Sequence, residues 1–301
     1  MKALLILITT FTILLAGNGD LHIYTINNKD GNIVPKMLEN ALKSGGFIIG
    51  QNANIQHELL TFFKDNNFKI YTNISFYHKD LTLKLLDKHP DAGVLVPMGI
   101  VMYQILGEDD LHIVIASSEM QAKLIGAHPK ELKKLEDTIL RTITTLFPSA
   151  THYYNTKSTS KTGDFLTKYS LDTQGSDFED VREELEESFE EKFEKAGFSM
   201  PSYFNLTKDL GKDSPYDFYV TYAICKLDAL KAVAKVKPQT AALGPCTTVI
   251  YKKKDEDKIV MAFVSMHSWI HSANITEKEI RKSLLQTQKS YESILKDVTK
   301  N

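Results

Sequence analysis

The feature that most constrains the fold is an order of elements that occurs twice along the chain. Residues 77–98 and 225–246 form two windows of equal length. In each window the end of a strand is followed by a helix, a proline turn, and a second proline one residue before the next strand. The prolines correspond in pairs, Pro90 with Pro238 and Pro97 with Pro245. One shared proline is expected by chance, whereas the whole order favours two diverged copies of one small α+β domain.

Hydrophobic periodicity gives a similar outline for the rest of each copy. In the first copy an alternating strand at 21–26 precedes a helix with one apolar face, which ends at Gly45-Gly46. A hairpin over 94–116 then leads into a long amphipathic helix after Pro129. The second copy shows a comparable series, with strands at 165–171 and 216–225, helices at 178–193 and 227–236, a hairpin over 247–264 and a final helix over 280–298. We therefore expect an α+β protein with two tandem small domains, the copies packed on each other.

Four segments follow from this outline. The first copy occupies residues 20–148 and the second occupies residues 164–301. Between them, residues 149–163 are rich in Ser, Thr, Lys and Tyr without periodicity, which predicts a linker. A length of 301 residues is ample for two domains of roughly 100–150 residues each.

Residues 1–19 are typical of a secretory signal peptide. Met1-Lys2 supplies a positive charge, and residues 3–16 form an uncharged apolar run that is shorter than the ~20 residues needed to span a bilayer. We expect cleavage near 16–19, no stable membrane anchor, and a mature protein in the periplasm or otherwise outside the cytoplasm. A retained anchor or an N-terminal core strand is the alternative.

The net charge of −2 excludes one large class of function. A nucleic-acid-binding domain usually carries a strongly basic surface, and this chain has neither that charge nor an interleaved basic and aromatic motif. We therefore expect no nucleic-acid partner.

The second window resembles the signature of the domain-of-unknown-function 302 family. That signature has a strand that ends in Cys-Asn-Pro, a Leu/Ala-rich helix, an Asp-Pro turn, and Leu-Pro-Cys at the start of a valine-rich strand. Here Cys225 and the Cys246 of Gly244-Pro245-Cys246 fall on the two cysteine positions, although Lys226 replaces the asparagine. The first copy keeps the frame at 89–98.

The resemblance covers about 21–146 and 165–298. It implies an antiparallel sheet with helices packed on one face in each copy, similar to the fold of TATA-binding protein. No catalytic activity is implied.

The two cysteines are candidates for a site in the second copy. Cys225 and Cys246 lie at the end of one strand and the start of the next, so that a helix and a turn return the chain between them. In an exported protein the simplest outcome is a structural disulfide, which stabilises by roughly 3 kcal/mol for a loop of this length. Two buried thiols, or a pair that binds a soft metal or exchanges electrons, remain open.

The equivalent place in the first copy carries Tyr77, His78 and Met98. Tyrosine, histidine and thioether groups all serve as haem or copper ligands. Core filling by Met98 and a solvated His78 is the simpler interpretation.

A third group is His267, Trp269 and His271. In a helix, the spacing of four residues would place both imidazoles on one face, as a metal site requires. Because the segment directly follows a strand, a surface loop anchored by the only tryptophan is the simpler interpretation. Exposed in this way, the three residues are candidates for recognition.

No motif fixes a reaction, because the chain has no P-loop, no G-x-G-x-x-G and no G-x-S-x-G. The sequence likewise identifies no metal and no cofactor. It favours a non-enzymatic binding protein for a small molecule or an exported protein partner. The alternatives are a thiol-based redox or metal- or haem-handling protein that uses Cys225 and Cys246, and a purely structural subunit.

Overall fold

The computed structural model describes residues 19–65, 67–155, 164–173 and 175–300. Residues 1–18 of the expected signal peptide therefore lie outside the described part of the chain. Within that part, no helix combines the length and the apolar character that crossing a membrane requires.

The first half of the chain alternates strands and helices. Its elements are β1 (Leu21–Asn27), α1 (Pro35–Ser44), β2 (Ile48–Asn54), α2 (Ile55–Phe63), β3 (Phe68–Tyr77), α3 (Lys79–Lys88), the 3-10 helix η1 (Pro90–Leu95), β4 (Met98–Ile105), β5 (Asp110–Ala116), α4 (Ser118–Ile125), α5 (Lys130–Leu146) and β6 (Thr151–Tyr154). The four residues of β6 lie inside the segment expected to be a linker, and they pair with β1 at the edge of the first sheet.

The second half repeats this series. Its elements are β7 (Leu166–Asp172), α6 (Phe178–Lys195), β8 (Ser199–Asn205), α7 (Thr207–Leu210), β9 (Tyr216–Cys225), α8 (Leu227–Ala234), the 3-10 helix η2 (Pro238–Leu243), β10 (Cys246–Lys253), β11 (Lys258–Val264), α9 (Met266–Ser272) and α10 (Lys278–Val298).

Both sheets are antiparallel and have the same strand order. The first runs β2-β3-β4-β5-β1-β6, and the second runs β8-β9-β10-β11-β7. Each strand of the second sheet thus has a counterpart in the first, and β6 is the extra strand among the described residues. The register also matches. Met98 lies opposite Phe76, and Cys246 lies opposite Ile224. Cys246 and Ile224 each follow their counterparts Met98 and Phe76 by 148 residues. The predicted α+β class, with antiparallel sheets and packed helices, is confirmed.

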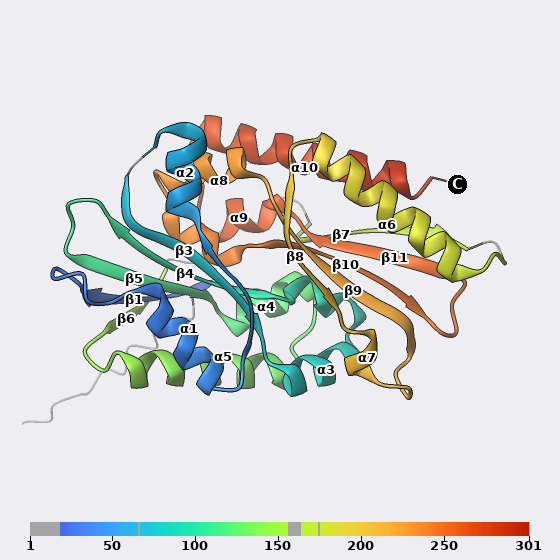
Figure 1. The fold of residues 1–301 in the computed structure, drawn as a ribbon, viewed down its shortest axis with the longest axis horizontal. Coiled ribbons are helices and arrows are strands. Elements are labelled where there is room, and N and C mark those ends of the chain that lie inside the picture. Colours follow the sequence, from blue (N-terminus) through green and yellow to red (C-terminus); the bar gives the residue numbers. More distant parts are fainter. Residues whose placement is uncertain (1–18, 66, 156–163, 174, 301) are drawn as a thin grey trace, which may run out of the picture.

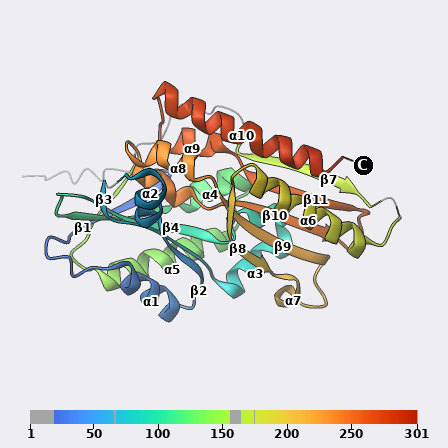
Figure 2. The same ribbon diagram turned by 45° about the horizontal axis from the view of Figure 1, so that its top comes forward.

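The two sheets lie between two outer layers of helices (Figure 1). Helices α1, α3 and α5 run along the first sheet, and α6 and α10 run along the second. Successive side chains along β9 point to opposite faces of the second sheet. Phe218, Val220 and Tyr222 join a core with Phe189 and Phe193 of α6, whereas Tyr219 joins the core that contains the first half. The view in Figure 2 shows the same separation of the outer helices.

The inner faces meet through the two 3-10 helices. Helix η2 of the second half packs on β4, and η1 of the first half packs on β10. The hydroxyl of Tyr71 donates a hydrogen bond of 3.1 Å to the carbonyl of Pro238, and the hydroxyl of Tyr219 donates one to the carbonyl of Pro90. Because both members of each pair are offset by 148 residues, the interface has an approximate two-fold relation between the halves.

Candidate functional site

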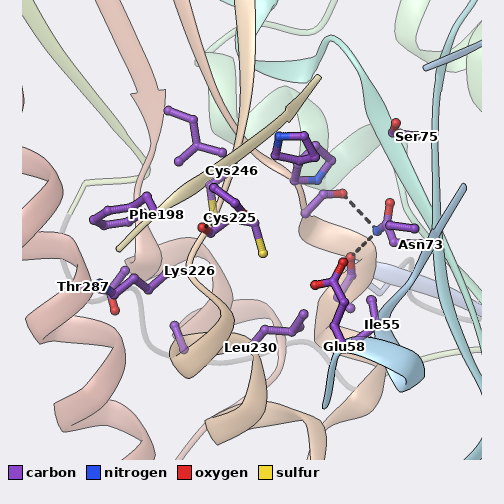
Figure 3. Close-up of a pocket in the computed structure, with 18 of the residues that line it drawn as sticks. Ile55, Glu58, Asn73, Ser75, Phe198, Cys225, Lys226, Leu230, Cys246 and Thr287 are labelled. Atoms are coloured by element: carbon purple, nitrogen blue, oxygen red, sulfur yellow. Dashed lines mark hydrogen bonds between the residues drawn. The ribbon is translucent and has the colours of Figure 1, made fainter. Parts of the chain in front are cut away.

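A cavity of about 90 Å³ lies where the two halves meet (Figure 3). One water molecule needs ~10–15 Å³ on this measure, so the cavity has room for several waters or for one compact organic molecule. The first half contributes residues from β2, α2 and β3, which are Gln51, Ala53, Ile55, Glu58, Asn73 and Ser75. The second half contributes the start of β8, the end of β9, α8, the turn before β10, and parts of α9 and α10.

The wall of the cavity is mainly apolar. Ile55 and Leu230 face each other across it in Figure 3, and Phe198 closes another side. Lys226 lies beside the cavity, but its ammonium group donates to the carbonyl of Ala196 and sits 4.7 Å from the centroid of the Phe198 ring. Its charge is therefore already engaged by the protein.

Three polar groups in the wall have no hydrogen-bond partner among the described residues. They are the hydroxyls of Ser75 and Ser202 and the indole N–H of Trp269, and all three atoms are buried. The side-chain amide of Asn73, in contrast, donates to the carbonyl of Ala241 at 2.8 Å. A buried polar group without a partner costs about 1–3 kcal/mol, so three in one wall are unusual.

Both cysteines line the cavity as free thiols, so the expected disulfide is absent. The reason lies in the register of the sheet. Cys246 on β10 is directly opposite Ile224 on β9. Cys225 is the next residue on β9, so the two cysteines are not a directly opposed cross-strand pair. The sequence showed that the chain returns, but not that the register is shifted by one residue.

The environment of the two thiols keeps them protonated. Burial, followed by the nearby Glu58 carboxylate, raises the pKa of Cys225 to about 12. Burial, followed by the neighbouring Cys225, raises the pKa of Cys246 even further above its ordinary value. Because the thiolate is the nucleophile and the metal ligand, both groups are held in the less reactive form.

A comparison of sequences finds a family that is similar to the second half of the molecule. The model of the family described as domain of unknown function DUF302 matches residues 169–298. The half of the chain that contains this match is called the DUF302 half below. The match confirms the resemblance of the second copy and covers both cysteines, whereas it does not extend to residues 21–146.

A crystal structure of an uncharacterized conserved DUF302 protein from Bacillus stearothermophilus is also similar to this chain. The two share 17% sequence identity with a TM-score of 0.36, over 45% of this chain and 98% of the other. No curated protein matches the chain.

Tyr77, His78 and Met98 do not form the common site that the alternative of haem or copper ligands requires, and Met98 is buried, as the simpler interpretation predicted. Met98 is opposite Phe76 on the neighbouring strand, so Tyr77 and Met98 point to opposite faces of the first sheet. Tyr77 packs instead against Phe204 of the DUF302 half, and His78 packs edge-on against Phe47. The described residues contain no group of three His, Cys, Asp or Glu side chains suited to a metal ion.

The segment with His267, Trp269 and His271 is a helix and not the expected surface loop. It forms α9, and the hydroxyl of Ser265 accepts a hydrogen bond from the amide of His267 at its first turn. Trp269 is only 5% exposed and His271 only 8%. The three residues are therefore not an exposed recognition surface. Trp269 nevertheless belongs to the site, because it lines the cavity between the two halves.

Sequence reasoning missed every residue that the first half contributes to the cavity. Asn73 and Ser75 are polar residues on a strand, which is ordinary for an exposed sheet face. Here that face is covered by η2 of the DUF302 half, as the hydrogen bond from Asn73 to Ala241 shows. These polar residues on β3 would have indicated a binding site only if the inner face of the first sheet had been known to be buried.

Proposed function

We propose that this protein is a non-enzymatic binding protein that holds a small molecule in the cavity between its halves. The observation that carries the proposal is the set of unpartnered polar groups in the cavity wall. Ser75, Ser202 and Trp269 come from three different elements, yet all three contribute to one cavity.

Buried polar groups without hydrogen-bond partners cost free energy of folding. The polar atoms of these three residues are buried just behind the cavity surface. A ligand with an apolar body and one or two polar atoms would cover the apolar wall, and it would give these groups hydrogen-bond partners once their side chains turn toward the cavity. Binding sites for small molecules generally combine a concave apolar wall with a few polar groups that orient the ligand. The cavity between the halves has both features.

The thiol-based alternative finds less support in the site. Thiol–disulfide exchange requires a thiolate, whereas the pKa values of Cys225 and Cys246 are both raised. An intramolecular disulfide also requires closely apposed side chains, whereas Cys225 and Cys246 are free thiols that are not directly opposite each other in the sheet.

Two further parts of the proposal concern origin and location. The common strand order and the constant offset of 148 residues support a duplication in which the first half is the more diverged copy. The charged and apolar pattern of residues 1–19 supports export. Cell fractionation of the expressed full chain, with detection of the shortened N-terminus by mass spectrometry, tests the second part.

The binding function is tested on the native protein. Purified protein is denatured, and the released small molecules are identified by mass spectrometry. We expect one compound at close to one equivalent, and about 5- to 10-fold less of it from Trp269→Phe, which loses the N–H but keeps an aromatic ring. The control is Tyr153→Phe, which changes an exposed tyrosine. Absence of any retained compound, together with no thermal shift in a panel of small organic molecules, would falsify the proposal.

A further inference from the structure

The two-fold relation between the halves defines a second position equivalent to the cavity. Asn73 and Thr221 are equivalent residues on β3 and β9, 148 residues apart. Ala53 lies opposite Asn73, and Phe204 lies opposite Thr221, so Ala53 and Phe204 are equivalent. Cys225 and Tyr77 are equivalent in the same way, because Ser199 lies opposite Cys225 and Ile48 lies opposite Tyr77.

The second position is filled by the protein itself. The rings of Tyr77 and Phe204 meet edge to face with their centroids 5.4 Å apart. Tyr77 is only 5% exposed. Phe204 also lies directly over Gly50, where a Cβ atom would come within 2.5 Å of the ring. One aromatic residue from each half therefore closes this position.

The cavity is open because its equivalents of these two rings are small. Cys225 occupies the place in the cavity that corresponds to Tyr77 at the filled position, and Ala53 occupies the place that corresponds to Phe204. Both line the cavity, and the sulfur of Cys225 points toward its interior in Figure 3. The replacement of two rings by a thiol and a methyl group leaves space between the halves.

Charge also differs between the two positions. At the filled position Lys79 donates to Asp209 at 2.6 Å. The counterpart of Asp209 at the open position is Glu58, whereas the counterpart of Lys79 is the uncharged Leu227. The open position therefore lacks a cation at the place of Lys79, and the ammonium group of Lys226 in the same wall already donates to the carbonyl of Ala196. An anionic ligand would lie near the carboxylate of Glu58.

We infer that the ligand of the cavity is a compact, uncharged aromatic molecule with one polar substituent, such as a simple phenol, and that Ala53 and Cys225 determine this specificity. The inference rests on the proposed binding function. Tyr77 and Phe204 show what the equivalent space accepts, which is a phenol ring against a second aromatic ring. The wall is mainly apolar, and the N–H of Trp269 and the hydroxyls of Ser75 and Ser202 lie buried just behind it, where a small rotation of these side chains would let them meet the polar substituent.

The ligand class is tested with matched probes in isothermal titration calorimetry. The probes are 4-methylphenol, 4-methylbenzoate, 4-methylbenzylammonium and 4-methylcyclohexanol, which differ in charge or in aromaticity. We expect 4-methylphenol to bind with a stoichiometry of one, at least 10-fold more tightly than either charged probe and several-fold more tightly than the saturated alcohol.

The roles of Ala53 and Cys225 are tested by replacing each with the aromatic residue found at the equivalent place in the filled position. The full chain with Ala53→Phe and Cys225→Tyr should lose binding of 4-methylphenol by at least 100-fold. The matched control is Tyr153→Phe, which changes an exposed tyrosine outside the cavity and should retain binding within about 3-fold. Because the double variant has a folding risk, Ala53→Leu alone serves as a milder block, with circular dichroism as the check on folding, and it should weaken binding at least 10-fold.

The outcomes separate the inference from the proposed function. If a compound is extracted from the native protein, but 4-methylphenol binds no better than the charged probes, the aromatic class is wrong and the binding function stands. Full affinity in a folded Ala53→Leu variant would overturn the role of Ala53. If no compound is extracted and no probe binds, the proposed function itself fails.

Discussion

The hydroxyl of Tyr71 on β3 donates a hydrogen bond to the carbonyl of Pro238 at the start of η2, 167 residues away along the chain. Tyr219 makes the equivalent bond to Pro90, so each half fixes the 3-10 helix of the other. These two bonds lie in the same interface as the cavity. Their strength therefore bears both on the stability of the molecule and on the shape of the site.

Removal of either hydroxyl should destabilise the protein. Tyr71→Phe and Tyr219→Phe each leave a carbonyl in the interface without its donor, and we expect each to lower the free energy of unfolding by about 1–2 kcal/mol. Urea unfolding followed by circular dichroism measures the loss. Tyr153→Phe is the matched control, because Tyr153 is 47% exposed, and it should change stability by less than about 0.5 kcal/mol. Equal stability of all three variants would contradict the assigned role of these bonds.

Gly99 is expected to tolerate no side chain. A Cβ atom on Gly99 would lie 1.8 Å from the carbonyl oxygen of Gly244, so that Gly99→Ala forces β4 away from the segment before β10. We expect a loss of about 3 kcal/mol in urea unfolding. In Gly244→Ala the nearest atom to the new Cβ is 3.3 Å away. We therefore expect this variant to lose only about 1 kcal/mol of unfolding free energy. If the two variants lost the same stability, the close approach at Gly99 would be wrong.

The raised pKa of Cys246 predicts a loss of stability at alkaline pH. In the unfolded chain a thiol titrates near about 8.5, whereas in the folded protein burial keeps this group protonated. Below that pH both states hold the proton, and above it the unfolded state alone releases it. Stability therefore falls as the pH rises, by up to about 1.4 kcal/mol per pH unit.

Cys246→Ala should remove this contribution. From pH 8 to pH 9.5 we expect the wild type to lose about 1 kcal/mol more than the variant in urea unfolding. Thiol titration in denaturant without reductant should first count two thiols, as the free cysteines require. Parallel stability curves for the two proteins would show that Cys246 titrates normally in the folded state.

The lowered pKa of Glu136 predicts a loss of stability at acidic pH, the opposite of the effect of Cys246. Burial alone would raise its pKa, but hydrogen bonds from His22 at 2.8 Å and from the amide and hydroxyl of Ser118 hold the pKa at about 2. The folded state therefore gains stability above the ordinary value near 4.3, and loses it as the pH falls toward 2. Glu136→Gln should cost about 2 kcal/mol at pH 6, with a difference from wild type that narrows progressively below pH 4.

The control for Glu136 lies on the next residue of the same helix. The side chain of Asp137 is 56% exposed and pairs with Lys133, so Asp137→Asn should change stability by less than about 0.5 kcal/mol at either pH. A pH-independent loss in Glu136→Gln would mean that packing, and not the charge, accounts for the effect.

The sequence predicted the fold better than it predicted the site, for a physical reason. Strand and helix periodicities are local, so the hairpins and most of the element order of both halves followed from residues close together in the chain, although α4, β8 and α7 were not predicted. The cavity depends instead on which strand faces are covered, and Ser75 looks like an exposed residue until the second half is packed on it. Helix α9 was missed because seven residues with two histidines and two serines carry little apolar periodicity.

The two cysteines also show that the sequence does not reveal which residues lie next to each other across strands. Their places at the end of β9 and the start of β10 were predicted correctly, and this suggested a disulfide. A register shift of one residue, which the sequence does not encode in any visible way, means that the two cysteines are not directly opposite each other. Likewise, the small residues Ala53 and Cys225 carry no signal until their equivalents Phe204 and Tyr77 are known.

A final prediction concerns the second half alone. One core cluster contains Tyr219 and Val249 of the second half together with Tyr71 and Ile74 of the first, so the isolated segment 164–301 exposes a large apolar face. We expect this segment to form a dimer, because the surface that covers the face in the full chain has the same topology as the segment itself. In such a dimer Phe204 of one copy would lie near Cys225 of the other, which narrows both cavities. Light scattering of the purified segment measures its mass, and a stable monomer with full resistance to urea would contradict the shared core.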